Sequence, residues 1–326
     1  MRPARPGPSH PTLLLPWHTS HHHHRTPVRR RQWRIHHRPA TAYRGPMPRS
    51  PRRAVRPTDA RPLPVGPQPI DTGTAELVPD RGETRAFTVH VNGVPSSHVH
   101  LDRPDLLDFE YMQHMAAVVD QMPPGGLRVL HLGAGACTMA RWVDHRRPGS
   151  NQLAVDVDAR LVDLVRTWFD LPRAPALRLR AEDANLTVAQ LPPHRWDVVI
   201  RDVFNGDRTP TALATTTSVA QIAQTLRPGG LYLANCADRP PLTLARAEVA
   251  TLAQHFSHVG LLAEPGQLRG RRYGNLVLVG TEDPDLLGGS GLGRALRSLP
   301  QPARVLHGDE LTSFTAGARP LRDGTG

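Results

Sequence analysis

The stretch LRVLHLGAGA at residues 127–136 is the strongest indication of the fold of this chain. Its first half is apolar enough for a buried strand, and Gly133 and Gly135 follow directly. Residues 137–146 then have the apolar spacing of a helix. A strand, a glycine turn and a helix present backbone N–H groups to a nucleotide, and the helix N-terminus adds a favourable dipole. The stretch therefore predicts a nucleotide-type binding site at the two glycines.

The sequence after this stretch continues to alternate between strand and helix patterns, which predicts a mostly parallel sheet covered on both faces. The strands are expected at 127–132, 152–156, 176–181, 196–202, 230–236, 258–263 and 274–280. The helices are expected at 137–146, 159–169, 184–190, 215–226, 243–256 and 285–298. Only a loop fits between the last two strands, so they are expected to pair as a hairpin with the final strand antiparallel. This is the Rossmann-like α/β sheet of the S-adenosylmethionine-dependent transferases.

A smaller unit is expected before the glycine stretch. Residues 86–91 alternate as a half-buried strand does, Asn92-Gly93 is a strong hairpin-turn signal, and residues 94–100 can return as the second strand. A helix is expected over 105–121. The predicted boundaries are a basic extension at 1–70, a small β-hairpin module at 71–104, a nucleoside-binding catalytic domain at 105–282, and a C-terminal extension at 283–326. Within that last part, 288–293 is expected to be a flexible link, and 303–314 a strand and a short helix.

Basic residues are concentrated at the start of the chain. All 40 residues counted as Lys or Arg are arginines, which excludes Schiff-base, pyridoxal phosphate and P-loop lysine chemistry. Residues 1–61 contain 14 Arg and one acid, a net +13, while the remaining 26 Arg face 28 acids, a net −2. The body therefore has no basic excess typical of a dedicated nucleic-acid site.

Residues 1–70 are rich in Pro, Arg and His and poor in apolar residues, so they are expected to be disordered. The main interpretation is a solvated extension. The alternatives are a polybasic arm for nucleic acid or an anionic membrane, and metal binding by the histidines at 21–24. No stretch is long and apolar enough to span a membrane. The two cysteines, Cys137 and Cys236, form no disulfide framework, so a cytoplasmic location is expected.

Polar residues at the ends of the predicted strands are the candidate ligand-binding groups. Thr138 stands where a dinucleotide fingerprint would have its third glycine, which disfavours NAD. Asp156 ends the second strand, and its two oxygens match the vicinal hydroxyls of a ribose. Asp183 ends the third strand and can either accept from an adenine amino group or cap the next helix. Asp202 follows VVI of the fourth strand and should emerge partly desolvated in the pocket.

Two further signals receive structural interpretations. Cys137 at a helix start could be a thiol of lowered pKa, but a small packed residue is the preferred interpretation. The arginines of 269–272 (RGRR) could meet a carboxylate or phosphate, but a solvated turn is preferred. The histidines of the body lack metal-ligand spacing, so no metal is expected.

The motifs of residues 86–280 resemble, in order, those of the spermidine synthase (polyamine aminopropyltransferase) family, particularly its spermidine-synthase-like bacterial branch. They are VNGV at 91–94, FEY at 109–111, LGAGA at 132–136, VDVD at 155–158, EDA at 182–184, WDVVIRD at 196–202 and LRPGG at 226–230. The hairpin before the helix and glycine loop is the more specific feature, because several of the other motifs recur in methyltransferases.

The resemblance implies a transferase that moves an aminopropyl group from decarboxylated S-adenosylmethionine to a small-molecule amine. Asp156 would then hold the ribose and Asp183 the adenine of this co-substrate. Asp202 would take the proton from the attacking amine, as general acid–base chemistry requires. Tyr111 and Asn205 would contact the amine substrate. The resemblance also implies a homodimer as one assembly.

The chain departs from the family at three places. Ala136 stands at the acidic position after the last glycine of the loop, Met112 follows Tyr111 where the family has His, and Asn205 replaces a second Asp. A polyamine needs a carboxylate for each of its charges, and Glu110, Asp105 and Asp207 are the candidates to compensate. Two alternatives therefore stay open. One is a methyltransferase using S-adenosylmethionine, and the other is a non-catalytic nucleoside-binding relative.

Overall fold

The quoted stretch forms the expected strand, loop and helix. The computed structural model describes residues 63–204 and 209–324, so the expectations for residues 1–62 and for Asn205 and Asp207 lie outside it. Strand β5 (Arg128–Leu132) leads through the glycines into α2 (Thr138–Arg146). The apolar residues of β5 are almost fully buried, so this strand anchors the loop that follows it.

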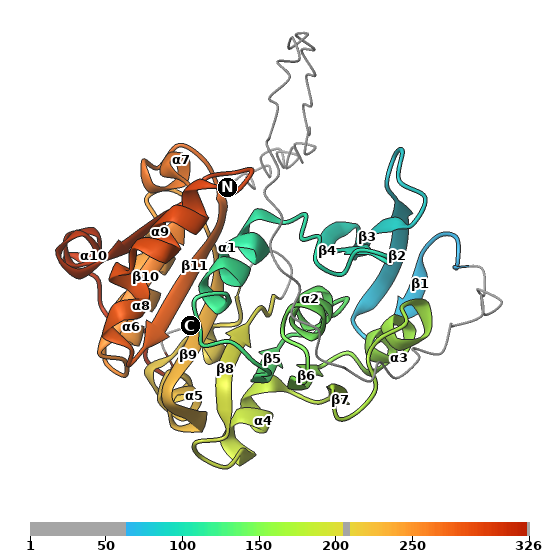
Figure 1. Ribbon diagram of the computed structural model, residues 1–326, viewed down its shortest axis with the longest axis horizontal. Helices are drawn as coiled ribbons and strands as arrows, with labels where there is room; N and C mark the ends of the chain where they lie inside the picture. Colours follow the sequence, from blue (N-terminus) through green and yellow to red (C-terminus); the bar gives the residue numbers. More distant parts are fainter. Residues whose placement is uncertain (1–62, 205–208, 325–326) are drawn as a thin grey trace, which may run out of the picture. The chain divides into compact units, whose positions relative to one another are not determined.

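The central sheet has the predicted parallel core and an antiparallel edge (Figure 1). Its eight strands lie in the order β12-β10-β11-β9-β8-β5-β6-β7. The pairs from β9 through β8, β5 and β6 to β7 are parallel, whereas β11 is antiparallel to both β9 and β10. The strands besides β5 are β6 (Asn151–Asp156), β7 (Leu177–Ala181), β8 (Trp196–Arg201), β9 (Leu226–Asp238), β10 (His258–Ala263), β11 (Gly274–Thr281) and β12 (Arg304–His307). The predicted hairpin of the last two expected strands is thus confirmed.

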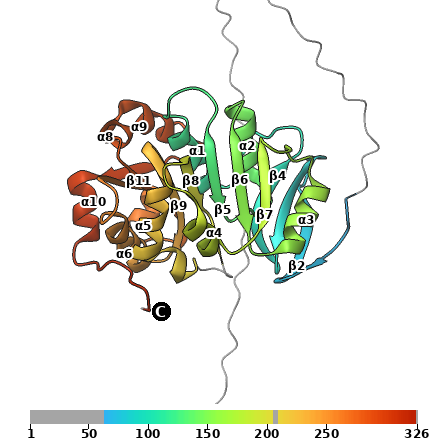
Figure 2. The same ribbon diagram turned by 90° about the horizontal axis from the view of Figure 1, so that it is seen from below.

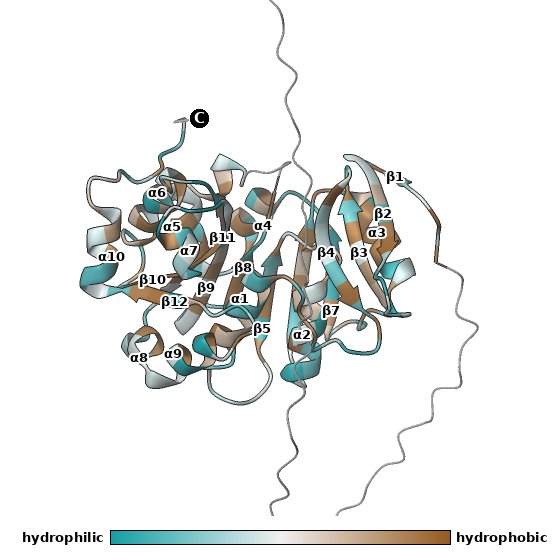
Figure 3. Cartoon of the chain, turned by 90° about the horizontal axis from the view of Figure 1, so that it is seen from above, coloured by the Kyte–Doolittle hydropathy of each residue, from teal (hydrophilic) through white to brown (hydrophobic). Residues whose placement is uncertain are grey.

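Two layers of helices cover the sheet, and each buries its own apolar cluster (Figures 2 and 3). One face is covered by α4 (Ala184–Gln190), α5 (Thr216–Thr225), α6 (Thr243–Leu252) and α10 (Gly308–Thr315). The other face is covered by α1 (Glu110–Val119), α2, α8 (Pro284–Gly288) and α9 (Ser290–Arg297). A 3-10 turn, η1 (Thr211–Leu213), precedes α5, and α7 (Pro265–Leu268) is a single turn in the segment where only a loop was expected. The helix expected at 105–121 is shorter, because it begins at Glu110.

The N-terminal module is a four-stranded antiparallel sheet rather than a lone hairpin. Strands β1 (Gln68–Ile70) and β2 (Gly73–Pro79) precede the predicted pair β3 (Ala86–Val91) and β4 (Val94–His100). Because β1 begins at residue 68, the expectation of disorder up to residue 70 is wrong at its end. The module packs with α3 (Ala159–Trp168) and the start of α2 through a third apolar cluster. Asn92 and Gly93 both have positive φ, as the turn signal predicts.

The C-terminal segment completes the central sheet. Strand β12 pairs with β10, and α10 follows it, which confirms the expected strand and short helix at 303–314. The flexible link expected at 288–293 is wrong, since α8 ends at Gly288 and α9 begins at Ser290. Leu292 and Leu296 of α9 are fully buried, and this packing explains why the glycines within α9 do not interrupt the helix. The domain boundaries themselves stay a prediction.

Within residues 63–204 and 209–324, no helix combines the length and the apolar character needed to cross a bilayer.

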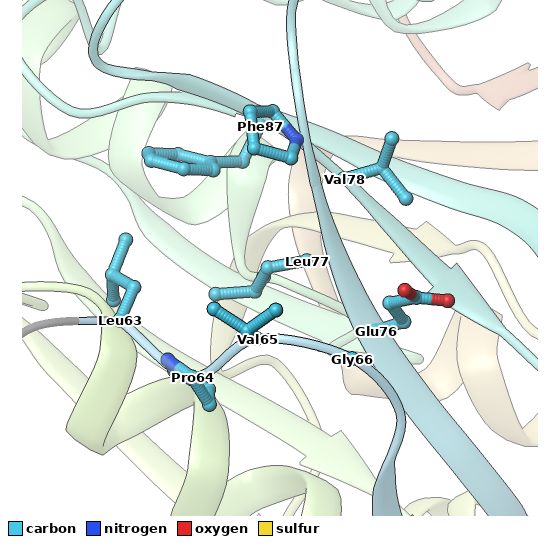
Figure 4. A pocket seen from close by; sticks show the side chains of 9 residues that line it. Leu63, Pro64, Val65, Gly66, Glu76, Leu77, Val78 and Phe87 are labelled. Carbon is cyan, nitrogen blue, oxygen red and sulfur yellow. The ribbon is translucent and has the colours of Figure 1, made fainter.

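An apolar hollow of about 240 Å³ lies on the module (Figure 4). Its walls are Leu63, Pro64, Val65, Gly66, Glu76, Leu77, Val78, Pro79 and Phe87. Figure 4 shows Leu63, Val65, Leu77 and Phe87 gathered on one side of strand β2, with the Glu76 carboxylate on the other. With so few polar groups, this hollow lacks the means to orient a nucleoside. The polar site lies instead at the carboxyl edge of the central sheet.

Candidate active site

The glycine loop, residues 133–137, is shaped by close contacts with its neighbours. Gly133 has φ of +91°, and a Cβ there would lie 2.1 Å from the carbonyl oxygen of Asp202. Gly135 has φ of +46°, and a Cβ there would lie 2.8 Å from Oγ of Ser97. Only glycine satisfies both the conformation and the contact at Gly133. The two predicted glycines therefore bring the loop backbone against the end of β8, beside Asp202.

Asp156 is half-buried at the end of β6 and holds the glycine loop. Its Oδ2 accepts hydrogen bonds from the N–H groups of Ala134 at 3.1 Å and Gly135 at 3.2 Å. Its Oδ1 accepts from the N–H of Asp158 at 3.1 Å. Burial raises the pKa of Asp156, and these three N–H groups oppose that rise. The predicted ribose-binding carboxylate thus lies beside the glycines, fixed by backbone groups.

Asp183 is exposed at the end of β7 and caps helix α4. Its Oδ1 accepts from the N–H groups of Asn185 at 2.8 Å and Leu186 at 3.2 Å. The capping interpretation is therefore correct, and the adenine-binding role stays a prediction. Two exposed apolar side chains flank these carboxylates, with Val157 following Asp156 and Leu186 in the first turn of α4. Exposed apolar groups beside polar ones suit the face and edge of a nucleobase.

Strand β4 of the N-terminal module contacts the glycine loop and the start of α2. The Ala136 N–H donates to Oγ of Ser97 at 3.2 Å, and Oγ1 of Thr138 donates to the carbonyl of His98 at 2.8 Å. The buried Arg141 also donates to two main-chain carbonyls at the end of β4. These bonds fix β4 against the start of α2. The side chain of Ala136 is buried in this contact, so the position where the family has an acid faces the module.

Asp202 lies half-buried at the end of β8, and side chains hold both of its oxygens. The hydroxyl of Tyr111 in α1 donates to Oδ2 at 2.9 Å, and Nδ2 of Asn235 in β9 donates to Oδ1 at 2.9 Å. Burial raises the pKa of Asp202, and these hydrogen bonds and the Arg201 charge oppose the rise. Burial and the Asp202 charge hold the pKa of Tyr111 well above its usual value. Tyr111 therefore remains a hydrogen-bond donor to an ionisable carboxylate.

Residues beneath Asp202 were not identified from the sequence. Arg201 is fully buried, and its Nη2 contacts Oε2 of Glu248 in α6 at 2.5 Å and the carbonyl of Asn235 at 3.1 Å. This ion pair joins β8, β9 and α6 directly below the clamped carboxylate. The available signal was polarity within apolar strands, since Arg201 ends VVIR and Asn235 interrupts LYLANCA.

The other sequence signals have mixed outcomes. Cys137 directly precedes α2 with φ of 58° and is buried, and burial raises its pKa to about 12. The packed interpretation of this thiol is therefore correct, and the reactive one is wrong. The described part of the chain contains no cluster of three or more His, Cys, Asp or Glu residues that could hold a metal ion. The structure brings Tyr111 and Asp202 together, whereas the substrate-binding role of Asn205 stays a prediction.

Comparison with solved structures identifies a protein that is similar over nearly its whole length. A probable spermidine synthase from Corynebacterium glutamicum is 37% identical, matches 80% of this chain and 97% of its own, and superimposes with a TM-score of 0.76. The spermidine synthase of Thermotoga maritima matches 77% of this chain at 12% identity, with a TM-score of 0.53, which supports the fold alone.

Curated sequences match a shorter part of the chain. A polyamine aminopropyltransferase of Neisseria meningitidis is 25% identical over 172 residues, and one of Chromobacterium violaceum is 23% identical over 158 residues. The matches span 52% and 48% of this chain, and 64% and 60% of the length of those relatives. No protein-family model matches the chain.

Proposed function

This chain belongs to the spermidine synthase (polyamine aminopropyltransferase) family, and we propose that it transfers an aminopropyl group from decarboxylated S-adenosylmethionine to an amine. One observation carries the proposal: the half-buried carboxylate of Asp202 is held between Tyr111 of α1 and Asn235 of β9 beside the glycine loop. A base held in this way suits a reaction that removes a proton from an amine during attack.

The nucleoside part of the donor would lie over the ends of β5, β6 and β7. The support for this is the backbone-held carboxylate of Asp156 beside Gly133 and Gly135, which suits a ribose diol. Asp183 has its Oδ1 committed to the helix cap, leaving Oδ2 to accept from an adenine amino group. Val157 and Leu186 offer apolar contacts for the base. This arrangement leaves the sulfonium end of the donor directed toward Asp202.

The transfer is a displacement at the carbon bonded to sulfur. The amine lone pair forms the new C–N bond while the C–S bond breaks, and its electron pair returns to sulfur to give a neutral thioether nucleoside. The nitrogen gains a positive charge, and its proton passes to the carboxylate of Asp202. Burial raises the pKa of Asp202, which improves its match to this proton acceptance. Holding the two reactants in line contributes much of the rate.

The methyltransferase alternative rests on Ala136, because no acid stands there to pair with an aminopropyl ammonium. The buried contact of Ala136 with the module is equally compatible with either donor. The donor is therefore best assigned by comparing the two nucleosides directly.

Calorimetric titration with decarboxylated and with intact S-adenosylmethionine is the experiment that tests the proposal. We expect the decarboxylated donor to bind at least about tenfold more tightly, a difference of about 1.4 kcal/mol. Tighter binding of intact S-adenosylmethionine would favour the methyltransferase. Binding of both without turnover of either in the presence of amines would favour a non-catalytic relative. The expected cytoplasmic location and homodimer stay predictions.

A further inference from the structure

The arginine-rich turn before β11 contains a residue that is not simply solvated. The guanidinium of Arg272 forms an ion pair with the carboxylate of Glu264, the residue that precedes α7. The same Nη2 lies 3.9 Å from Oε1 of Glu110, the first residue of α1. The side chains of Glu264 and Glu110 are 19% and 27% exposed, against 45% for Arg272. Arg272 is therefore exposed, as a solvated turn predicts, and it also meets a carboxylate, which was the alternative interpretation.

This ion-pair triad lies next to the proton-accepting carboxylate. Glu110 directly precedes Tyr111, whose hydroxyl donates to Asp202. The negative charge of Glu110 also contributes to the raised pKa of Tyr111, so the two groups are within electrostatic reach. Arg272 lies just before strand β11, and Glu264 lies just after strand β10. Strand β11 is the neighbour of β9, which contains Asn235.

The triad lies on the side of Asp202 away from the proposed donor. The proposed donor groups belong to β5, β6 and β7, which lie on one side of β8 in the sheet, whereas β9 and β11 lie on the other. An amine attacking in line from opposite the leaving sulfur approaches from the β9 and β11 side. It would meet Tyr111 and Asn235 first, with Glu110, Arg272 and Glu264 beyond them.

A diamine brings two ammonium groups to such a site, and each needs an anionic partner. Asp202 would take the nitrogen that reacts. Glu110 and Glu264 would suit the second nitrogen by charge, but the guanidinium of Arg272 lies against both and cancels one of their two charges. A second ammonium would also be repelled by the guanidinium. The guanidinium of Arg272 thus takes the place that the second ammonium group of a diamine would occupy beside these carboxylates.

We propose, on the basis of the aminopropyl transfer proposed above, that Arg272 is a specificity-determining residue and that the acceptor is an amine with one cationic nitrogen rather than a diamine. Removing this guanidinium frees Glu110 and Glu264 for a second ammonium. A variant without this guanidinium is therefore expected to gain activity with a diamine, and damage to the fold does not produce such a gain.

The test compares butylamine with the four-carbon diamine of the same length in the full-length protein. Specificity is the ratio of kcat/KM for the diamine to kcat/KM for butylamine, measured by release of the thioether nucleoside. We expect the wild-type ratio to be below one, and Arg272→Gln to raise it at least about tenfold. Arg271→Gln is the matched control, because Arg271 is exposed and has no ion pair within the part of the chain that the structure describes. It should leave the ratio within about twofold of wild type.

A double variant ties the effect to the freed carboxylate. Adding Glu110→Gln to Arg272→Gln removes one of the two released charges, so the ratio should fall back at least about threefold from the Arg272→Gln value. An unchanged ratio in Arg272→Gln, or a wild-type enzyme that already favours the diamine about tenfold, would overturn the inference while leaving aminopropyl transfer intact.

Absence of product with both amines in every variant would instead count against the proposed function. Calorimetric binding of the two amines in the presence of the donor then decides the inference separately. Tighter diamine binding by Arg272→Gln than by wild type supports it, and equal binding overturns it.

Discussion

The two halves of the carboxyl edge of the central sheet are built in different ways. At the ends of β6 and β7, Asp156 and Asp183 are fixed by main-chain N–H groups of the adjacent loop and helix. At the end of β8, Asp202 is fixed by side chains of Tyr111 and Asn235, which lie 91 and 33 residues away in the chain. A buried ion pair of Arg201 and Glu248 lies directly behind the second half, since Arg201 precedes Asp202 in β8.

This contrast indicates where a single substitution should have the largest effect. A carboxylate held by backbone groups keeps its position when neighbouring side chains change, because the path of the chain is unaltered. A carboxylate held by side chains loses its orientation when one of them is removed. Substitutions in the Asp202 half should therefore lower the reaction rate and the stability. Substitutions in the Asp156 half should mainly lower the affinity for the donor.

The largest effect is expected at the base itself. Asp202→Asn keeps the size of the side chain and removes its ability to accept a proton, so kcat should fall about 10²- to 10⁴-fold. Donor affinity should change by no more than about twofold, because the proposed nucleoside site is formed by the ends of the other strands. Steady-state rates and calorimetry on the same preparation measure both quantities. A variant that keeps the wild-type rate, or that loses donor binding instead, would contradict the proposed separation of a catalytic half from a donor-binding half.

The ion pair beneath Asp202 should dominate stability. Glu248→Ala leaves the Arg201 guanidinium buried without its partner, which should lower the free energy of unfolding by about 3–5 kcal/mol. Arg180→Ala is the comparison on the other half, where the Arg180 and Glu182 pair is solvent-exposed. It should leave the urea midpoint nearly unchanged. Urea denaturation measures the free energy of unfolding of both variants. Equal decreases in the two would contradict this difference between the halves.

Asp156 should control affinity for the donor. Asp156→Ala removes the acceptor for two loop N–H groups and for the ribose, so donor affinity should fall by about 1.5–3 kcal/mol, roughly 10- to 100-fold. At saturating donor, kcat should stay within about threefold of wild type, since Asp202 and its clamp are unaltered. Titration calorimetry and saturation kinetics separate the two. A loss confined to kcat would reverse the assignment of the halves.

Tyr111→Phe should change the pH dependence of the rate. A base works when ionised, so activity is present above the pKa of Asp202 and is lost as the pH falls through it. Tyr111 stabilises the ionised carboxylate and opposes the rise that burial causes. Its removal should raise that pKa, shift the acid limb of the kcat profile to higher pH, and lower the neutral-pH rate about 5- to 10-fold. An acid limb at the wild-type position argues against this role.

The smallest effect is expected at Asp183. Asp183→Ala removes the cap of α4 and should cost about 1 kcal/mol of stability, whereas Asp183→Asn keeps a capping side chain and should be nearly neutral. If the carboxylate also accepts from adenine, both variants weaken donor binding, even though only the first weakens the helix. Denaturation and calorimetry on the pair distinguish a helix cap from a nucleobase contact.

The same contrast explains how much the sequence could predict. Gly133, Gly135, Asp156 and Asp202 follow short apolar strands, and parallel strands bring their carboxyl ends to one edge, so local patterns are enough to find them. The partners of Asp202 depend on which strand lies beside β8 and on where α1 packs. No local pattern in the chain contains that information, although the arginine and asparagine inside apolar strands are visible signals.

Elements outside the core were predicted less well, for local reasons. Strand β1 was missed because Pro67 and Pro69 flank or interrupt a three-residue strand, which only pairing with β2 reveals. The glycines of α9 indicated a link, but its buried leucines decide the outcome. The carboxylate partners of Arg272 were not identified from the sequence because they belong to residues 110 and 264, in other elements of the fold.

The most direct test of the central claim is to identify what leaves and what is transferred when the purified chain meets a donor and an amine. With decarboxylated S-adenosylmethionine and butylamine, mass spectrometry should find one aminopropylated amine for each thioether nucleoside released. Intact S-adenosylmethionine should give no methylated amine. Methyl transfer from the intact donor, with no product from the decarboxylated one, would contradict the account.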